Sequence, residues 1–485
     1  MRHTNKRTKR SRGIAIVLTT LTLAVTLPLV GLGFDVGTLF LIKSKLSSAA
    51  DAAALAGARA LSQGASSGAQ EANAISTAQN FFSGNFPAGY WRTTGSSAAV
   101  TVDDTSTPNY RTVTVSATVQ APLYFLRVFN QQFSTINVTS QAGRRDVLMM
   151  LVLDRSNSMN QIVSGAGLSA CAIMKADAAA FVGYFAPGRD QIGLVVFSGS
   201  SFVYPPTASF TTPDSKGNTI PSLISSIACA GSTSTAEALH LAYNQVVSAN
   251  STTRSNIVML MTDGLPTGIT ADFSARVKTG DSSCKPTGLG VFPGGTVSGN
   301  MFPGGSLGLS VDQQTSITNA NDTPISSGAG CHFYTNEGSV SQDIASLPSQ
   351  DYFNNSTQGN YTALSPVYGQ AANLNDVSTA QGAVYSAINA ADNQATKIRS
   401  NITLRPTIYT IGLAGDGAVD QQPDPLLLMK MANDPNMAGF SSLGQTFYQQ
   451  QVNQPQGLYA DAPDASQLAV AFDTIARQIS IRLSR

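Results

Sequence analysis

The sequence predicts an α/β protein: a doubly wound, mostly parallel sheet, preceded by an N-terminal transmembrane helix and a small α+β segment. Three observations lead to this prediction. Apolar runs of strand length alternate with segments of helical periodicity from residue 146 onward. An apolar stretch at residues 13–42 follows a basic N-terminus. Between these regions, an alanine-rich segment leads into strands of alternating apolar and polar residues.

The composition is that of a large globular chain with few charges. The 485 residues exceed what one domain normally needs, and a hydrophobic fraction of 42% supports a sizeable core. Lys and Arg number 29 and Asp and Glu number 28, so the net charge of +1 gives no signal for nucleic-acid binding. No nucleic-acid partner is expected.

The N-terminus indicates a membrane anchor. Residues 1–12 form a basic cytoplasmic tail, and the apolar run at 13–42 exceeds the roughly 20 residues that span a bilayer. The basic cluster should stay in the cytoplasm and place the rest of the chain outside. A cleaved secretory signal is the alternative, although no A-x-A site follows the apolar run promptly. Asp35, late in the run, is interpreted as lying near the hydrated outer interface rather than as a functional intramembrane acid.

The next segment, residues 43–142, predicts a helical stalk and a small β segment. Alanine dominates "KSKLSSAADAAALAGARAL", which favours helix, and residues 97–142 alternate like strands. A long helix followed by a small antiparallel sheet resembles the plan of pilins. The stretch "GLGFDVGTLFLIKSKLSSAADAAALAGARAL" resembles the TadE/TadG-like proteins of the tight-adherence (Flp) pilus system over about residues 12–62. The resemblance implies a role in Flp pilus assembly at the bacterial envelope. Leu18 stands where the pseudopilin pattern has Glu, so the uncleaved, TadG-like version fits better.

The main domain is expected over residues 146–485. Continuous apolar strands at 147–153, 191–197, 256–261 and 406–413 are typical of a parallel sheet covered on both faces. Helices are predicted at 169–185, 234–247, 380–398 and 464–483. The last of these helices places Leu468, Phe472, Ile475 and Ile479 on one face.

Five oxygen-bearing side chains come at the ends of these strands or in a nearby loop. Asp154, Ser156 and Ser158 follow the first strand, Asp263 follows "NIVMLMT", and Thr233 precedes a helix. In doubly wound sheets, ligands bind beyond the carboxyl ends of the strands. Oxygen-only ligands favour hard cations, so the set predicts a divalent cation, Mg²⁺ first, with Ca²⁺ or Mn²⁺ as alternatives. Strand-terminal caps and turn residues are the alternative interpretation.

This set resembles the metal-ion-dependent adhesion site (MIDAS) of von Willebrand factor type A domains. "DRSNS", "TSTAEAL" and "MTDG" match the D-x-S-x-S motif, the distal Thr loop and the distal Asp, in that order. The resemblance covers about residues 146–266 and 380–485. It implies metal ligation by Asp154, Ser156, Ser158, Thr233 and Asp263, with an open position for a partner's acidic side chain.

The four cysteines suggest disulfides outside the cytoplasm. In the implied fold, Cys171 on the helix after the metal loop comes close to Cys229, just before the Thr233 loop. Cys284 and Cys331 then bracket an insertion. Free buried thiols remain an alternative, and no C-x₂-C spacing favours zinc.

Residues 267 to about 375 depart from the basic α/β plan. They are rich in Gly, Ser, Asn and Thr, and "FPGG" occurs twice. A stretch of this length without helical periodicity is unusual in a compact domain. Because it directly follows Asp263, it should emerge on the metal-binding face, as a cover, a partner contact or a decoration.

Enzyme motifs are missing from the sequence. No G-x-S-x-G sequence joins a predicted strand to a predicted helix as a nucleophile elbow. The sequence has no H-E-x-x-H and no G-x-x-x-x-G-K-[ST], and His3, His240 and His332 are dispersed. We therefore expect no catalytic residues and no enzyme. The expected function is a single-pass, membrane-anchored extracytoplasmic binding or assembly protein, TadG-like in Flp pilus biogenesis. The alternatives are a general envelope adhesin not tied to pili and a metal-dependent hydrolase on the same fold.

Overall fold

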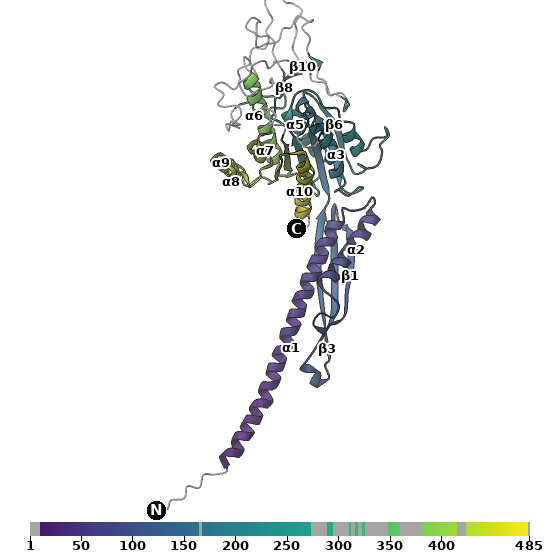
Figure 1. The fold of residues 1–485 in the computed structure, drawn as a ribbon, viewed down its shortest axis with the longest axis vertical. Helices are drawn as coiled ribbons and strands as arrows, with labels where there is room; N and C mark the ends of the chain where they lie inside the picture. Colours follow the sequence, from purple (N-terminus) through teal and green to yellow (C-terminus); the bar gives the residue numbers. More distant parts are fainter. Residues whose placement is uncertain are drawn as a thin grey trace, which may run out of the picture. The chain divides into compact units, whose positions relative to one another are not determined.

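The computed structural model describes residues 10–163, 167–272, 289–293, 310–311, 316–318, 323–324, 348–358, 380–414 and 423–483. Figure 1 shows the chain coloured along its sequence. It divides into two compact units. The N-terminal unit holds the chain up to Arg144 apart from a few residues at 64–67, and the C-terminal unit extends from Arg145 to Leu483.

The N-terminal unit is a long helix, a shorter helix and a three-stranded sheet of order β1-β2-β3. Its elements are α1 (Arg10–Ala60), α2 (Ser67–Asn85), η1 (Tyr90–Arg92), β1 (Thr94–Thr107), β2 (Tyr110–Pro122), η2 (Leu126–Phe129) and β3 (Phe133–Arg145). Strands β1 and β2 pair antiparallel. Side-chain hydrogen bonds link Gln120 to Thr135 and Gln141 to Thr114, the order of an antiparallel β2–β3 pair.

Helix α1 has two parts with different surroundings. From Ile14 to Val30 every side chain is exposed, and most are apolar. From Gly31 onward one face of the helix is buried. Among the described residues, Ile14–Ala60 is the one helix long and apolar enough to cross a membrane, judged by length and composition. The last residues of the predicted span at 13–42, from Gly31 onward, therefore belong to the part of α1 that packs against the rest of the N-terminal unit.

Small side chains let α1 approach the sheet and α2 closely. The core of this unit combines alanines of α1 and α2 with Val113, Val115 and Val119 of β2. A Cβ at Gly57 would lie 3.0 Å from Val113 and 3.1 Å from the Ala74 carbonyl oxygen. Buried Arg111 donates to Gln70 of α2 and to the carbonyl of Leu61, the residue that follows α1. The alanine-rich segment is thus a packing face of the unit.

The interpretation of Asp35 as a hydrated interfacial acid is wrong. Its side chain is only 1% exposed. The carboxylate accepts hydrogen bonds of 2.8–3.2 Å from the backbone N–H groups of Tyr124, Phe125 and Leu126, just before and within η2. Three N–H donors replace the water that a carboxylate would otherwise need. Asp35 therefore holds the β2–β3 connection against α1.

The C-terminal unit is built on a six-stranded sheet, which confirms the predicted fold class. The strand order is β13-β12-β7-β4-β5-β6, and every described pairing is parallel except β5–β6. The strands are β4 (Val147–Asp154), β5 (Gln191–Phe197), β6 (Ser201–Thr207), β7 (Ser255–Thr262), β12 (Thr407–Leu413) and β13 (Tyr459–Ala462). Every residue of β4 is buried, as expected of a central strand covered on both faces.

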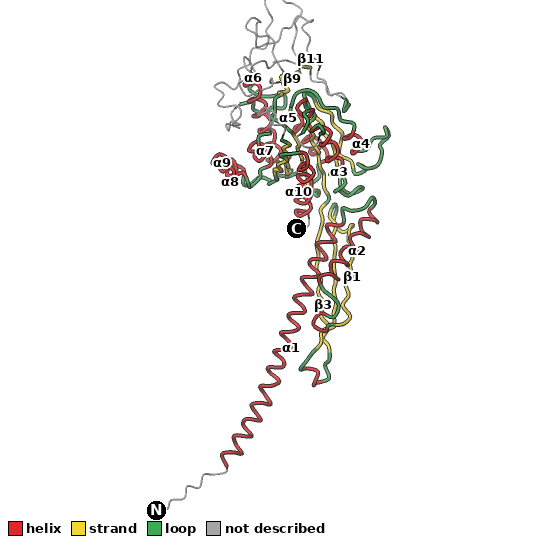
Figure 2. Tube along the Cα trace, viewed as in Figure 1, coloured by secondary structure: helices red, strands yellow, loops and turns green. Residues whose placement is uncertain are grey.

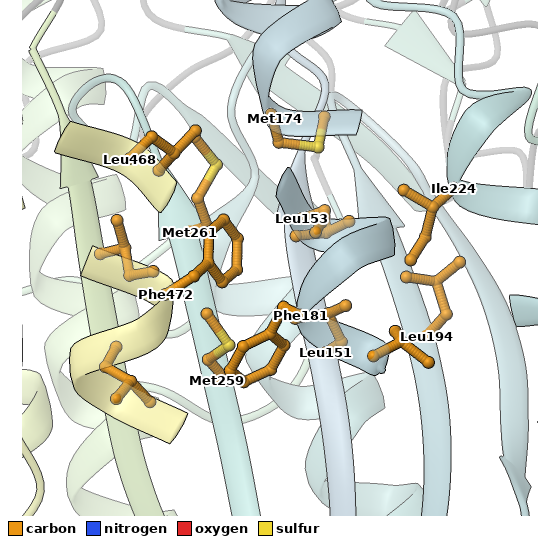
Figure 3. Packing of buried hydrophobic residues seen from close by; sticks show 14 of the residues in the cluster. Leu151, Leu153, Met174, Phe181, Leu194, Ile224, Met259, Met261, Leu468 and Phe472 are labelled. Carbon is orange, nitrogen blue, oxygen red and sulfur yellow. The ribbon is translucent and has the colours of Figure 1, made fainter. Parts of the chain in front are cut away.

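Helices cover both faces of this sheet (Figure 2). On one face lie α3 (Ala170–Val182), α4 (Ile220–Ser225) and α10 (Ala465–Leu483). On the other lie α5 (Thr235–Ala249), α6 (Ala380–Arg399), α7 (Pro425–Ala432) and α9 (Ser442–Gln451), with the short α8 (Met437–Phe440) between the last two. Figure 3 shows the first face, where Phe181 of α3 and Phe472 of α10 meet over Met259 and Leu151. The predicted apolar face of α10 is confirmed, since Leu468, Phe472, Ile475 and Ile479 are each at most 2% exposed.

The described part of the insertion forms a second, four-stranded sheet of order β11-β10-β9-β8. Its strands are β8 (Gly268–Asp272), β9 (Leu289–Pro293), β10 (Ser310–Val311) and β11 (Thr323–Pro324). Residues 348–358 also pack on the helices: the Phe353 ring stacks on His240 at 4.3 Å, and Lys397 donates to the Phe353 and Asn354 carbonyls. These described pieces are integral to the C-terminal unit.

Candidate metal centre

Asp154 is the last residue of β4, which lies between β5 and β7 in the sheet. The chain then turns through Arg155 and Ser156 into the short helix η3 (Asn157–Asn160). The Ser156 N–H donates to Asp154 Oδ1 at 2.7 Å, which folds the loop back over the strand end. The Arg155 N–H donates to the Phe197 carbonyl at the end of β5. The loop is therefore fixed by its own strand and its neighbour.

Four of the five predicted site residues are linked by hydrogen bonds. Ser156 Oγ and Ser158 Oγ are 2.9 Å apart, and Ser158 Oγ donates to Asp263 Oδ1 at 2.7 Å. Asp154 is linked to this series of hydrogen bonds because its Oδ1 accepts from the Ser156 N–H. Asp154, Ser156 and Asp263 are at most 2% exposed, whereas Ser158 is half-buried. The two carboxylates thus lie below a serine that still reaches solvent.

Thr233 reaches the same edge of the sheet through its loop. The Asn157 N–H donates to the Gly231 carbonyl at 2.9 Å. The Thr233 carbonyl accepts from the N–H groups of Thr267 and Gly268, just after the Asp263 turn. The Thr233 loop therefore lies between the other two loops. In the described part of the chain, no hydrogen bond joins the Thr233 hydroxyl to the other four residues, so its approach to them rests on the backbone alone.

Burial raises the pKa of both carboxylates. The pKa of Asp154 rises to about 6, because desolvation outweighs the hydrogen bonds from Thr262 and Ser156. The pKa of Asp263 rises well above its ordinary value, because burial and the negative charge of Asp154 both disfavour ionisation. A cation between the two carboxylates would reverse this balance.

Three further residues shape the site, and the sequence analysis identifies none of them. The Thr262 hydroxyl donates to Asp154 Oδ2 at 2.6 Å and fixes the orientation of that carboxylate. The buried Arg155 side chain donates to the carbonyls of Ser316 and Ile317 in the insertion. Asn160 Nδ2 donates to the Cys229 carbonyl at 2.9 Å. "MTDG" offered a faint hint of Thr262, since a hydroxyl at a strand end next to Asp is well placed to bind it.

A disulfide joins Cys171 of α3 to Cys229, with the two Cα atoms 6.4 Å apart. These are the two cysteines that the sequence analysis pairs. Together with the Asn160 contact, the disulfide holds the start of the Thr233 loop beside the metal loop. The second expected pair, Cys284 and Cys331, lies outside the described residues.

The donor set fits a hard divalent cation. Two carboxylates provide the negative charge, and the serine hydroxyls add neutral oxygens. In a cation-free protein, Asp154 and Asp263 are two buried acids whose mutual repulsion is offset by hydroxyl donors. The chemistry of the residues therefore matches Mg²⁺ or a similar ion, with Asp154, Ser156, Ser158, Thr233 and Asp263 as candidate ligands.

The raised pKa values predict an unusual pH dependence of stability without cation. Between pH 4 and about pH 6 the folded protein retains protons that the unfolded chain has lost, so stability falls as pH rises. For Asp154, a pKa of about 6 instead of 3.8 corresponds to about 3 kcal/mol of unfolding free energy lost by pH 7. Urea unfolding with a chelator at pH 4.5 and 7 measures most of this loss, about 2 kcal/mol, because part of it occurs below pH 4.5.

The matched control for this titration is Asp154→Asn, which keeps the shape and lacks the titrating charge. The wild type should lose more stability than the variant over this pH interval, and Mg²⁺ should restore the wild type alone at pH 7. Equal losses in the two proteins would show that other groups dominate the titration.

Two sequence families match this chain. Residues 149–265 match the von Willebrand factor type A domain, and residues 13–60 match the Flp pilus-assembly TadE/G-like family. Both matches confirm the resemblances seen in the motifs. The first match extends from β4 to the turn after Asp263, and so includes all three loops of the site.

Solved structures show more distant similarity. A mutant of the PilB minor pilin from Streptococcus sanguinis is 14% identical, with 80% of this chain and 79% of that one covered and a TM-score of 0.36. The vWF domain of the type V pili tip protein Mfa5 from Porphyromonas gingivalis is 18% identical, with coverage of 70% and 97% and a TM-score of 0.36.

The pilus adhesin SpaC from Lactobacillus rhamnosus GG is 13% identical, with a TM-score of 0.37. The match covers 80% of this chain and 34% of SpaC, about a third of that protein's structure. The comparison with curated proteins found no match.

Proposed function

We propose that this chain, which combines a TadE/G-like N-terminal segment with a von Willebrand factor type A domain, is a membrane-anchored binding and assembly protein of Flp pilus biogenesis. The anchor is α1, with its basic tail in the cytoplasm and both folded units outside. The recognition site is the cation centre at the carboxyl ends of β4 and β7. The proposal rests above all on one observation: the hydrogen-bonded chain that joins Asp154, Ser156, Ser158 and Asp263.

The site chemistry favours recognition of an acidic protein partner. Asp154 and Asp263 are buried and oriented, so they offset the charge of a bound cation while most of the coordination shell stays neutral. A cation with few charged ligands remains electrophilic and accepts a further carboxylate. Half-buried Ser158 marks the side of the site that faces solvent. A partner's Asp or Glu would complete the shell from that side.

Membrane anchoring follows from the first part of α1. From Ile14 to Val30 the apolar side chains are exposed on every side of the helix, and none of the residues that the structure describes covers them. The basic residues before it favour a cytoplasmic N-terminus. The C-terminal unit would then present its metal loops outside the membrane.

Two other functions could use the same fold and the same cation site. A general envelope adhesin would use the same cation site without pilus components. A hydrolase would need an additional general base or nucleophile near Asp154, and the hydrogen-bonded neighbours of Asp154 in the described residues are Thr262 and Ser156, neither of them paired with a histidine. The binding proposal therefore accounts for more of the site.

A membrane-impermeant crosslinker added to intact spheroplasts tests orientation and partner together. We expect crosslinks between the C-terminal unit and a pilus secretion or pilin component, with loss of most of them in the presence of a chelator and recovery with Mg²⁺. Labelling only after lysis would disprove the orientation. Crosslinks that the chelator leaves unchanged would disprove the use of a cation, and crosslinks only to other envelope proteins would favour the general adhesin.

A further inference from the structure

The two ends of the three-stranded sheet differ in polarity. At one end, the connection between β2 and β3 exposes five large apolar side chains: Tyr124 (36%), Phe125 (44%), Val128 (82%), Phe129 (70%) and Phe133 (49%). At the other end, the β1–β2 turn carries the sequence Thr-Ser-Thr-Pro-Asn at 105–109. We call residues 123–133 the apolar foot. Exposed aromatic residues gathered on one short connection indicate a surface that is covered in the working protein.

The apolar foot is fixed at a defined position along the axis of α1. Asp35 accepts hydrogen bonds from three N–H groups of the foot. The Phe34 and Tyr124 rings meet edge to face at 5.6 Å. A Cβ at Gly31 would lie 2.0 Å from the Phe125 ring, so a larger residue there would displace the foot. The foot therefore lies beside residues 31–35 of α1.

This position on α1 coincides with the outer end of a minimal span that starts at Ile14, within the predicted apolar run at 13–42. A helix rises 1.5 Å per residue, so about 20 residues counted from the basic N-terminus cross a hydrocarbon core of about 30 Å. Starting at Ile14, that length ends close to Phe34. The inference thus rests on the proposed anchoring by α1. Exposed Leu32, Phe34, Val36 and Phe40 continue the apolar surface of the helix past the foot.

The backbone of the foot is suited to surroundings that contain little water. Asp35 accepts from the N–H groups of Tyr124, Phe125 and Leu126. Leu123, Val128, Asn130 and Gln131 donate to carbonyls within the foot. Seven of its N–H groups are thus satisfied internally, which irregular backbone needs near lipid. Aromatic rings are favoured at the membrane interface, and the exposed Arg127 can extend toward headgroup phosphates.

We propose that the apolar foot inserts into the outer leaflet beside α1, at the boundary between headgroups and acyl chains. The lipid bilayer is the occupant of this surface, because the foot continues the apolar surface of the helix and carries no exposed acid of its own. The N-terminal unit is then attached at two points, the span and the foot. Two attachments restrict the tilt of the sheet relative to the membrane, which a single helix would leave free.

Depth-dependent fluorescence quenching of the full chain in lipid vesicles tests this proposal. The only tryptophan, Trp91, is first replaced by phenylalanine. Single tryptophans are then introduced as Phe129→Trp or Val128→Trp in the foot and as Thr107→Trp at the polar end of the same sheet. All three positions are exposed, so the fold should tolerate each change. Lipids brominated high on the acyl chains should quench the two foot tryptophans at least about twofold, since interfacial segments lie about 5–10 Å deep.

The control Thr107→Trp should show no quenching and should remain open to acrylamide in water. If the chain floats with the vesicles but the foot tryptophans behave like the control, the foot proposal fails while the anchor stands. If the foot tryptophans are shielded from both acrylamide and bromine, another protein or a second copy covers the foot, which also overturns the proposal. If the chain does not float with vesicles, the anchor itself fails, and the proposed function loses its membrane placement.

Discussion

Replacing Asp154 by asparagine or alanine should abolish cation binding, with an affinity loss of more than about 100-fold. Changes to outer-shell partners alone typically weaken metal affinity about 10- to 100-fold, and Asp154 is a candidate ligand that also anchors the loop. The asparagine oxygen can still accept from the Ser156 N–H, and its amide nitrogen can donate to the Thr262 hydroxyl oxygen, but the charge is removed. Isothermal calorimetry with Mg²⁺ or Mn²⁺ measures the affinity, and circular dichroism measures the fold.

Graded variants at the other site residues separate ligation from folding. Ser156→Ala should weaken binding less than Asp154→Asn, because water can replace a neutral hydroxyl. Thr262→Val should have an intermediate effect, because the Asp154 carboxylate loses the donor that orients it. Asp146→Ala is the matched control, since Asp146 is also buried and adjoins the opposite end of β4. It should lower stability without a specific loss of cation binding.

Two outcomes would contradict the cation assignment. Unchanged affinity in folded Asp154→Asn would show that any bound cation lies elsewhere. A wild type that binds no divalent cation at neutral pH would show that the acidic cluster is structural, with Asp154 and Asp263 serving as hydrogen-bond acceptors for Thr262 and Ser158.

The main sheet could be predicted because its signals are local. The uninterrupted apolar run at 147–153 predicts a strand that is buried on both faces, because an exposed strand would alternate with polar residues. The acid at the end of this strand lies where doubly wound sheets bind ligands. The sequence analysis does not predict strand β6. Its sequence "SFVYPPT" contains two prolines, which lack the backbone N–H that a strand uses for pairing. The structure places β6 at the edge of the sheet, paired antiparallel with β5, where prolines are tolerated.

Contacts between distant parts of the chain escaped prediction for a different reason. Asp35 and the foot are about 90 residues apart in sequence, and Arg155 binds carbonyls about 160 residues away. No periodicity encodes such pairs. In each case a charged side chain is buried because backbone groups satisfy it, and only the folded chain shows which ones. A charge in an apolar segment predicts that a partner exists without identifying it.

Removing the Cys171–Cys229 disulfide should destabilise the C-terminal unit by about 4 kcal/mol. The two cysteines are 58 residues apart, and chain-entropy estimates give about 3 kcal/mol for a loop of 15 residues and about 4.7 kcal/mol for one of 100. Cys171 is 6% exposed, so replacing both cysteines by alanine avoids placing a polar group in the core. Urea unfolding of the double variant in detergent, compared with wild type under oxidising conditions, measures the loss.

The disulfide should also affect the cation site, but more weakly. It holds Cys229, whose carbonyl accepts from Asn160, while the Ala230 N–H donates to the Arg155 carbonyl and the Asn157 N–H to the Gly231 carbonyl. These hydrogen bonds still position the loop when the disulfide is absent, so cation affinity should fall by less than in Asp154→Asn. A stability change below about 1 kcal/mol would show that the unfolded chain is already restricted in this region. Reductant added to the double variant then reports separately on Cys284 and Cys331, because any further loss of stability can arise only from that pair.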